Sequence, residues 1–142
     1  MSHTLVIFGA SGDLTSRKLV PAMYSQFRKQ RLAEKLRIVG SARTPMESAA
    51  WRESLGETTA QFAGRDFDPA AWRRFAESIE YFSGDATRRA DVEALQEKLR
   101  QCEQGESCTR VYYLATAPQF FEPIVNLLGG HVSAAAVTMI AS

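Results

Sequence analysis

The junction between an apolar run and a glycine turn near the start of the chain constrains the fold most. Leu5–Phe8 leads straight into Gly9-Ala10-Ser11-Gly12-Asp13-Leu14. A short run of branched and aromatic residues is typical of a strand buried on both faces, as in a parallel sheet. Gly9 can adopt turn dihedral angles that other residues avoid, and Gly12 lets a ligand approach the backbone. The pattern therefore predicts a strand, a tight turn and a helix.

The start of that helix is a candidate anion site. Ser11 or Asp13 is the expected cap, and the first N–H groups and the positive end of the helix dipole attract phosphate. The usual G-x-G-x-x-G fingerprint is incomplete here, so a plain strand–turn–helix join that uses glycine only for its dihedral angles is the alternative. We expect a pyrophosphate to be held by Gly9, Ala10, Ser11, Gly12, Asp13 and Leu14.

The composition is that of an ordinary folded domain. The chain has 142 residues with a net charge of +1, 45% hydrophobic residues and 23% charged residues, which suits one α/β domain with a real core. The near-neutral, interleaved charge gives no general attraction for nucleic acid or an anionic membrane. No apolar run approaches the roughly 20 residues of a membrane span, and no basic leader precedes a long apolar stretch. We expect a single cytoplasmic domain without nucleic-acid or membrane partners.

Cysteine and histidine spacing predicts no metal site. Cys102 and Cys108 are six residues apart, whereas His3 and His131 are distant in the sequence. This spacing matches no usual zinc pattern. We expect two reduced thiols of minor structural importance.

Strand-like and helical stretches alternate along the chain. Apolar residues at helical spacing, namely Leu19, Ala22, Met23 and Phe27, predict a helix that kinks or restarts at Pro21. Later helices are expected from Glu47 to about Phe62, from Pro69 to Ser78 with Asp68 as cap, and from Arg88 to about Cys102. The expected strands are Leu5–Phe8, Arg37–Gly40, Ile79–Phe82, Arg110–Leu114 and Ala135–Ile140.

This alternation predicts βαβ units, and so a single three-layer α/β domain with a doubly wound, Rossmann-like parallel sheet. Large apolar residues of the later helices and of the strand that begins at Ile79 are expected in the core: Trp51, Leu55, Trp72, Phe75, Ile79, Val92, Leu95 and Leu99. Ligands of such sheets bind beyond the carboxyl ends of the strands. One rim of the sheet should therefore carry Gly9–Leu14, Ser41–Thr44, Gly84–Ala86 and Ala115–Pro118.

Arg43 indicates which nucleotide is bound. The chain lacks the G-x-x-x-x-G-K-[ST] pattern of a P-loop, which disfavours a simple ATPase or GTPase. NAD-specific folds usually place an acid after the second strand to bind the ribose 2′-hydroxyl, but here no acid occurs between Arg43 and Glu47. An arginine at this place forms charge-assisted hydrogen bonds with a 2′-phosphate. The predicted cofactor is therefore NADP.

Four segments resemble, in order, the glucose-6-phosphate dehydrogenase family. The first is Gly9–Leu14 with Arg17-Lys18-Leu19-Val20-Pro21-Ala22-Met23-Tyr24, which is similar to the family opening G-A-S-G-D-L-A-x-R-K-L-x-P-A-L-Y. The others are Ile38–Arg43, Tyr81–Asp85 and Tyr113–Pro118 followed by Phe121–Val125. Ordered matches from Leu5 to about Gly129 are more specific than any one of them.

The resemblance implies an oxidoreductase of the pentose phosphate pathway that oxidises glucose 6-phosphate to 6-phosphogluconolactone with NADP. It implies that Gly9–Leu14 hold the pyrophosphate and that Arg43 holds the 2′-phosphate. Asp85 and Ala115 to Pro118, including Thr116, would line the rest of the cofactor groove. Lys18 would reach the substrate side of the cleft, where its ammonium suits a sugar phosphate or hydroxyl.

Two family segments are absent from the sequence. Members carry E-K-P-F-G after the strand that follows Pro123, and then R-I-D-H-Y-L-G-K-E, whose histidine is the general base. His3 and His131 stand in no matching context, and a misplaced base cannot transfer the proton. The sequence therefore offers no catalytic residue. We expect a coenzyme domain without its C-terminal substrate domain, which binds NADP without turnover.

Two other functions are alternatives for such a fold. A stand-alone NADP-binding or regulatory module would associate with another chain, or with itself, through apolar surface at Phe120, Phe121, Ile124 and Leu127. A short-chain reductase needs a Tyr-x-x-x-Lys pair. The four tyrosines are followed four residues later by Arg28, Asp85, Thr116 and Ala117, so none supplies that lysine.

Overall fold

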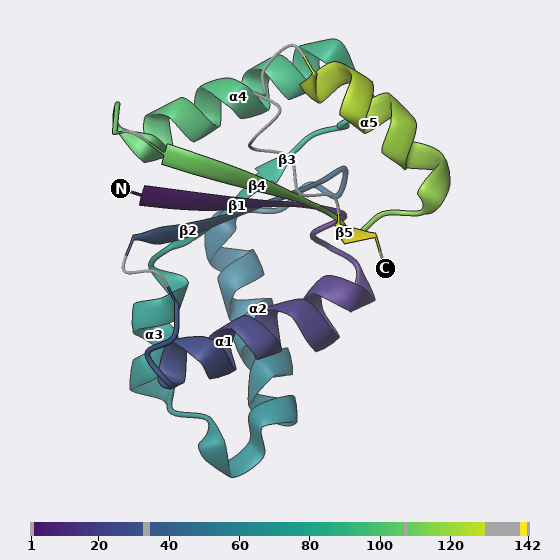
Figure 1. Ribbon diagram of the computed structural model, residues 1–142. Helices are drawn as coiled ribbons and strands as arrows, with labels where there is room; N and C mark the ends of the chain where they lie inside the picture. Colours follow the sequence, from purple (N-terminus) through teal and green to yellow (C-terminus); the bar gives the residue numbers. More distant parts are fainter. Residues whose placement is uncertain (1, 33–34, 107, 130–139, 142) are drawn as a thin grey trace.

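The computed structural model describes residues 2–32, 35–106, 108–129 and 140–141 (Figure 1). Its centre is a parallel sheet with the strand order β3-β2-β1-β4-β5. The strands are β1 (Ser2–Phe8), β2 (Leu36–Ala42), β3 (Ile79–Ser83), β4 (Cys108–Leu114) and β5 (Ile140–Ala141).

The first strand is the middle of the sheet. On β1, Leu5 lies opposite Ile38 of β2 and Val111 of β4. The chain builds outward from β1 on one side through β2 and β3, and then crosses to β4 on the other side. The carboxyl end of β1 is therefore the switch point of the sheet, where ligands of open α/β folds bind. The doubly wound α/β fold expected from the sequence is confirmed.

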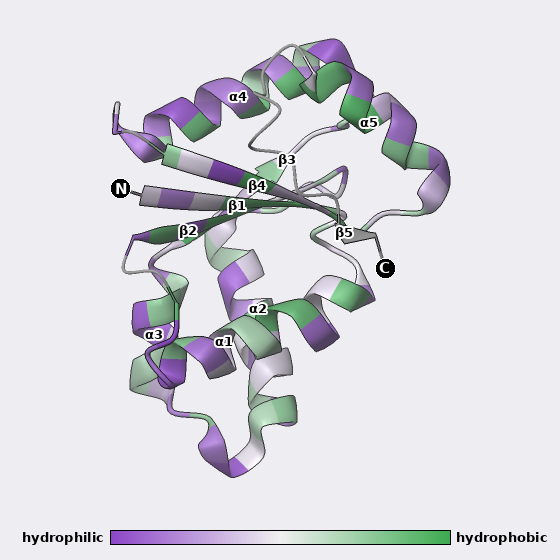
Figure 2. Ribbon diagram, in the orientation of Figure 1, coloured by the Kyte–Doolittle hydropathy of each residue, from purple (hydrophilic) through white to green (hydrophobic). Residues whose placement is uncertain are grey.

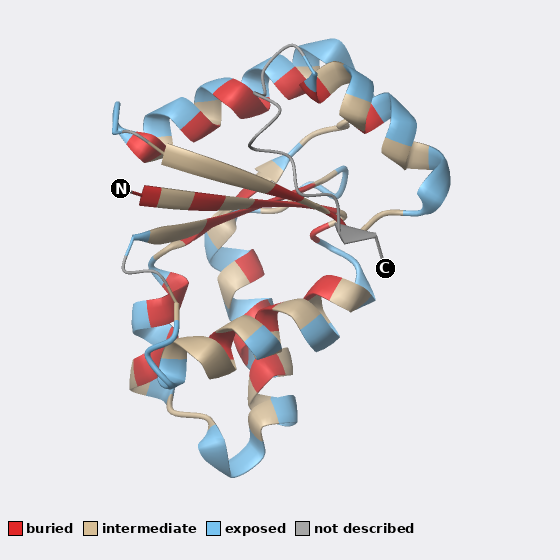
Figure 3. Ribbon diagram, viewed as in Figure 1, coloured by how far each residue is buried: buried red, intermediate tan, exposed pale blue. Residues whose placement is uncertain are grey.

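Helices cover both faces of the sheet (Figure 1). One face carries the π-helical turn η1 (Thr15–Leu19), α1 (Val20–Arg28), α2 (Ser48–Ala63), the 3-10 turn η2 (Gly64–Asp66) and α3 (Pro69–Ala76). The other face carries α4 (Arg89–Glu103), the 3-10 turn η3 (Pro118–Phe120) and α5 (Phe121–Leu128). Hydrophobic and buried residues of the helices face the sheet, while their hydrophilic residues face outward (Figures 2 and 3).

Successive side chains of β1 point to opposite faces of the sheet and so belong to two separate hydrophobic clusters. Ile7 belongs to the cluster on the α1–α3 face, whereas Val6 and Phe8 belong to the cluster on the α4–α5 face. The large apolar residues expected in the core are buried, with exposed fractions between 0% and 8%. They are Trp51, Leu55, Trp72, Phe75, Ile79, Val92, Leu95 and Leu99.

The predicted restart at Pro21 is confirmed, because α1 begins at Val20 with the proline in its first turn. Three of the four apolar residues at helical spacing, Leu19, Met23 and Phe27, pack against the core of the α1–α3 face. Val20 and Tyr24, beside them on the helix, are buried, and Ala22 is exposed.

The predicted capping of the first helix is wrong. Among the described residues, the side chains of Ser11 and Asp13 accept no hydrogen bond from a backbone N–H. The Ser11 hydroxyl instead accepts a hydrogen bond from the Thr44 hydroxyl at 3.2 Å, and the Asp13 carboxylate lies 3.9 Å from the guanidinium of Arg17. By contrast, the Asp68 cap is confirmed, because its carboxylate accepts from the N–H of Ala70 at 3.1 Å.

The structure also bears on Ile124, the two cysteines and the expected last strand. Ile124 is only 2% exposed and packs on the α4–α5 face, so its predicted role in an open apolar surface is wrong.

Both cysteines are free thiols. Most of the expected strand Ala135–Ile140, like His131, lies outside the described residues, although Ile140 pairs with Tyr113. Within the described part of the chain, no helix is long and apolar enough to cross a membrane.

Candidate functional site: a cavity at the switch point

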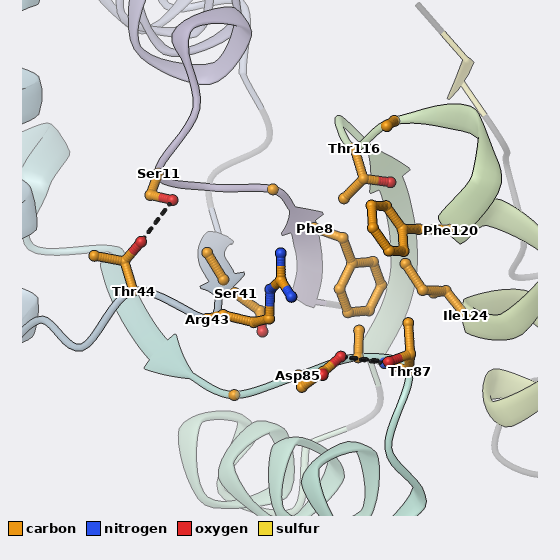
Figure 4. A pocket seen from close by; sticks show the side chains of 15 residues that line it. Phe8, Ser11, Ser41, Arg43, Thr44, Asp85, Thr87, Thr116, Phe120 and Ile124 are labelled. Atoms are coloured by element: carbon orange, nitrogen blue, oxygen red, sulfur yellow. Dashed lines mark hydrogen bonds between the residues drawn. The ribbon is translucent and has the colours of Figure 1, made fainter.

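A cavity of about 280 Å³ opens at the carboxyl ends of four strands (Figure 4). Each strand from β1 to β4 contributes the loop that follows it, as the sequence predicted for this rim. The residues that line the cavity are Phe8, Gly9, Ser11, Ser41, Ala42, Arg43, Thr44, Gly84, Asp85, Ala86, Thr87, Thr116, Ala117, Phe120 and Ile124.

The turn after β1 requires glycine at its first position. Gly9 has a φ of +82°, and a Cβ there would lie 2.8 Å from the carbonyl carbon of Ala115. The N–H groups of Gly9 and Ala10 both donate to the carbonyl oxygen of Ser41, at 2.9 and 3.2 Å. The turn is therefore held between the loops that follow β2 and β4. These two amides are satisfied by the protein.

Two other amides of the turn remain available to a ligand. The N–H of Gly12 is not one of them, because it donates to the carbonyl of Gly9 at 3.0 Å. The N–H groups of Ser11 and Asp13 have no acceptor among the described residues. Backbone N–H groups at a turn leading into a helix can bind a phosphate group. Gly9 fixes the direction of this turn, and the open amides supply its donors.

Arg43 brings the positive charge of the cavity. It is exposed, follows β2, and its guanidinium carbon lies 5.8 Å from the centre of the Phe120 ring, a cation–π distance. Figure 4 shows the guanidinium extending across the cavity between Asp85 and Phe8. Its side chain is thus placed to pair with an anionic ligand.

Asp85 brings a negative charge to the same cavity. Its carboxylate accepts hydrogen bonds from the hydroxyl of Thr87 at 2.6 Å and from the Thr87 N–H at 2.9 Å. These bonds, with smaller contributions from the nearby Arg43 and Arg88, hold the pKa of Asp85 below its ordinary value. The sequence near Arg43 contains no acid, but the fold supplies this one from the loop after β3.

The structure brings only some of the expected site residues into the cavity lining. Gly9, Ser11, Arg43, Asp85 and Thr116 line the cavity. The methyl group of Ala10 is buried in the core, and its carbonyl accepts from the indole N–H of Trp51 at 3.3 Å. The other expected residues lie outside the cavity lining: Gly12, Asp13, Leu14, Lys18, Ala115 and Pro118.

Sequence reasoning missed several residues of the cavity wall. Ser41 and Thr44 were within a predicted rim segment but were given no role, although Ser41 anchors the glycine turn. Phe8 and Ile124 were assigned to a strand and to an open surface, respectively. Thr87 lies just past the predicted rim segment Gly84–Ala86, and the Asp-x-Thr spacing of Asp85 and Thr87 is the signal that indicates such a turn.

Among the residues that the structure describes, no histidine lines this cavity. His3 lies near the start of β1, at the opposite end of that strand from Gly9. Among residues 2–32, 35–106, 108–129 and 140–141, no group of three or more histidine, cysteine or acidic residues is arranged to hold a metal ion. The geometry is that of a binding site for an anionic ligand.

A parallel sheet of this order, with a glycine turn and an anion site at its switch point, defines a Rossmann-like nucleotide-binding domain. The family model described as "Glucose-6-phosphate dehydrogenase, NAD binding domain" matches residues 6–140. The chain therefore belongs to the glucose-6-phosphate dehydrogenase family, a family of oxidoreductases.

Individual relatives support this assignment. The chain is 38% identical over 133 residues to glucose-6-phosphate 1-dehydrogenase of Treponema pallidum (strain Nichols), covering 91% of this chain and 26% of that protein. It is 36% identical over 126 residues to the enzyme of Mycolicibacterium smegmatis, covering 87% and 26%. The chain thus spans about a quarter of the length of the curated relatives that it matches.

Solved structures share the fold. Glucose-6-phosphate 1-dehydrogenase from Mycobacterium avium superposes with a TM-score of 0.82 at 30% identity, covering 97% of this chain and 28% of that chain. A glucose-6-phosphate dehydrogenase in complex with its substrate glucose-6-phosphate has the same TM-score at 24% identity, covering 97% and 29%. In both cases the shared fold covers less than a third of the neighbour's own chain.

Proposed function

We propose that these residues bind NADP, as the coenzyme domain of an enzyme that oxidises glucose 6-phosphate to 6-phosphogluconolactone. The observation that carries the proposal is the placement of Arg43 in the same cavity as the glycine turn. An arginine after the second strand supplies charge-assisted hydrogen bonds for a ribose 2′-phosphate.

The residues present fit such a group. Gly9, which lacks a Cβ, lets the turn pack against the backbone of Ala115, and the N–H groups of Ser11 and Asp13 are open donors for a diphosphate. Arg43 would hold the 2′-phosphate, and Asp85 would line the adjoining wall without contacting it, because two anions repel. NADP⁺ held by these residues would supply the hydride acceptor for oxidation of the sugar.

The substrate class follows from the relatives. One structural neighbour is described with glucose-6-phosphate as its substrate, and the curated relatives are named for oxidising it. Lys18 is exposed on η1 and would face the sugar phosphate outside the coenzyme cavity. Hydride transfer needs sugar and nicotinamide held together. We infer that the 142-residue chain binds NADP but doesn't turn over glucose 6-phosphate, and that the protein works in the cytoplasm.

The test is calorimetry of NADP⁺ and NAD⁺ with the 142-residue chain and with Arg43→Ala. The variant should weaken NADP⁺ binding by about 1–3 kcal/mol, because charged hydrogen bonds are lost, and leave NAD⁺ binding nearly unchanged. Arg88→Ala is the matched control, because it removes an exposed positive charge 3.7 Å from Asp85 outside the cavity lining. Equal losses for both coenzymes would refute the role of Arg43 at the 2′-phosphate.

A further inference from the structure

Thr116 carries a buried hydroxyl without a hydrogen-bond partner in the wall of the cavity. Within the described residues, only Arg37 and Thr59 also have a buried side-chain atom that lacks a partner. An unpaired buried hydroxyl lowers stability, so native proteins seldom keep one without a use for it. Of these three residues, Thr116 alone lines the cavity at the switch point.

The side chain of Thr116 lies directly beside the glycine turn. Its methyl carbon would be 3.1 Å from a Cβ at Gly9, so the methyl group faces the turn, as Figure 4 shows. A rotation of about 120° about χ1 brings the hydroxyl of threonine to the position of its methyl group and moves the methyl group to the position of the Cβ hydrogen. The hydroxyl can therefore reach the space beside Gly9 without movement of the backbone.

The order of the strands fixes which part of a dinucleotide this hydroxyl meets. Arg43 follows β2, on one side of β1, whereas Thr116 follows β4, on the other side. Gly9, at the end of β1, lies between them. A dinucleotide with its 2′-phosphate at Arg43 and its diphosphate at the glycine turn continues toward Thr116 with its second ribose.

We infer that the Thr116 hydroxyl donates a hydrogen bond to the nicotinamide-side ribose of NADP⁺. This inference rests on the proposed function. The hydroxyl is kept unpaired in the protein because its partner is the coenzyme, and it contributes to the affinity for the nicotinamide half. Arg43, on the other side of β1, contributes to the affinity for the adenosine half.

The experiment compares NADP⁺ with adenosine 2′,5′-bisphosphate, which lacks the nicotinamide ribose, by calorimetry on the 142-residue chain. Thr116→Val keeps the shape of the side chain and removes the hydroxyl. It should weaken NADP⁺ binding about tenfold, the effect of one lost hydrogen bond, and leave adenosine 2′,5′-bisphosphate binding unchanged. Thr116→Ser, which keeps a hydroxyl, should bind NADP⁺ within about twofold of the parent chain.

Thr59→Val is the matched control, because Thr59 has the same kind of unpaired buried hydroxyl on α2, outside the cavity. Both valine variants should melt at or above the temperature of the parent chain, whereas only Thr116→Val should lose NADP⁺ affinity. If Thr116→Val does not fold, Thr116→Ala tests the same difference between the two ligands.

The outcomes separate this inference from the proposed function. Unchanged NADP⁺ affinity in Thr116→Val overturns the inference and leaves the coenzyme site standing. An equal loss for both ligands also overturns it, because the variant then distorts the whole site. If the parent chain binds neither ligand, the proposed function fails, and the inference fails with it.

Discussion

At the scale of single residues, two glycines of the sheet are required by different neighbours. Gly9 combines a positive φ with close approach to the backbone of Ala115. Gly40, on β2, has ordinary dihedral angles, but a Cβ there would collide with the Trp51 ring and lie 2.7 Å from the Cβ of Ala10. The first glycine shapes the site, and the second lets Trp51 pack against the sheet behind it.

Gly9→Ala should destabilise the protein by about 3 kcal/mol, because the added methyl group meets a rigid carbonyl and the left-handed backbone disfavours a side chain. Urea unfolding monitored by tryptophan fluorescence measures the change. Gly105→Ala is the control, because Gly105 has a φ of +76° and no atom within 4 Å of the added Cβ. It should cost only about 1 kcal/mol, and equal losses would show that the Ala115 contact contributes nothing.

At the scale of elements, a buried polar network joins α4 to β4 and β1. Arg110 of β4 donates to both carboxylate oxygens of Glu103, at 2.6 and 2.9 Å, and to the Gln96 side-chain carbonyl at 2.6 Å. The hydroxyl of Thr4 donates to Glu103 at 3.0 Å. The ion pair fixes how α4 lies on the sheet, because each charge needs its partner once it is removed from water.

These contacts control the ionisation of Glu103. Burial acts to raise the pKa of this carboxyl, but hydrogen bonds from Arg110, Cys108 and Thr4, with the charge of Arg110, together hold it below its ordinary value. A lowered pKa in the folded state means that the stabilisation is complete above the ordinary pKa. It is lost as the pH falls through the folded-state pKa.

Glu103→Gln should therefore lower the free energy of unfolding by about 3 kcal/mol at neutral pH, because Arg110 is left without a counter-charge. The difference from the parent chain should shrink as the pH falls below about 4, where the parent carboxylate also becomes protonated. Urea unfolding at a series of pH values measures this difference. Glu97→Gln, in an exposed ion pair with Arg100 on the same helix, should change stability by less than about 0.5 kcal/mol. A constant gap between parent and Glu103→Gln across the pH series would contradict the assignment.

At the scale of the whole molecule, the candidate site belongs to no single element. Its wall comes from the loops after β1, β2, β3 and β4, and it reaches the core on the α4–α5 face through Phe8 and Ile124. A ligand in this cavity would contact loops that only the folded sheet holds together. Binding should therefore stabilise the folded molecule as a unit.

NADP⁺ at about 100 times its dissociation constant should raise the free energy of unfolding by about 2.7 kcal/mol. Thermal unfolding at increasing NADP⁺ concentration measures the effect. NAD⁺ at the same concentration should raise the melting temperature less, and Arg43→Ala should reduce the NADP⁺ shift to the NAD⁺ level. A melting temperature that NADP⁺ leaves unchanged would be evidence against the proposed site.

Local sequence determined much of this protein. A parallel α/β sheet is predicted by the apolar run Leu5–Phe8, the glycine turn and the alternation of strands and helices. These features depend only on residues close together in the sequence, because a few consecutive side chains decide whether a strand is buried on both faces and how a turn is shaped. The same reasoning predicts the four rim segments and selects Arg43, since strand ends in such a sheet share one edge.

Tertiary structure decided what depends on partners far along the chain. Ala10 turned into the core, where its carbonyl accepts a hydrogen bond from the indole of the distant Trp51. The unpaired Thr116 hydroxyl has no counterpart in the sequence pattern, because a missing hydrogen bond is defined only when every neighbour is in place.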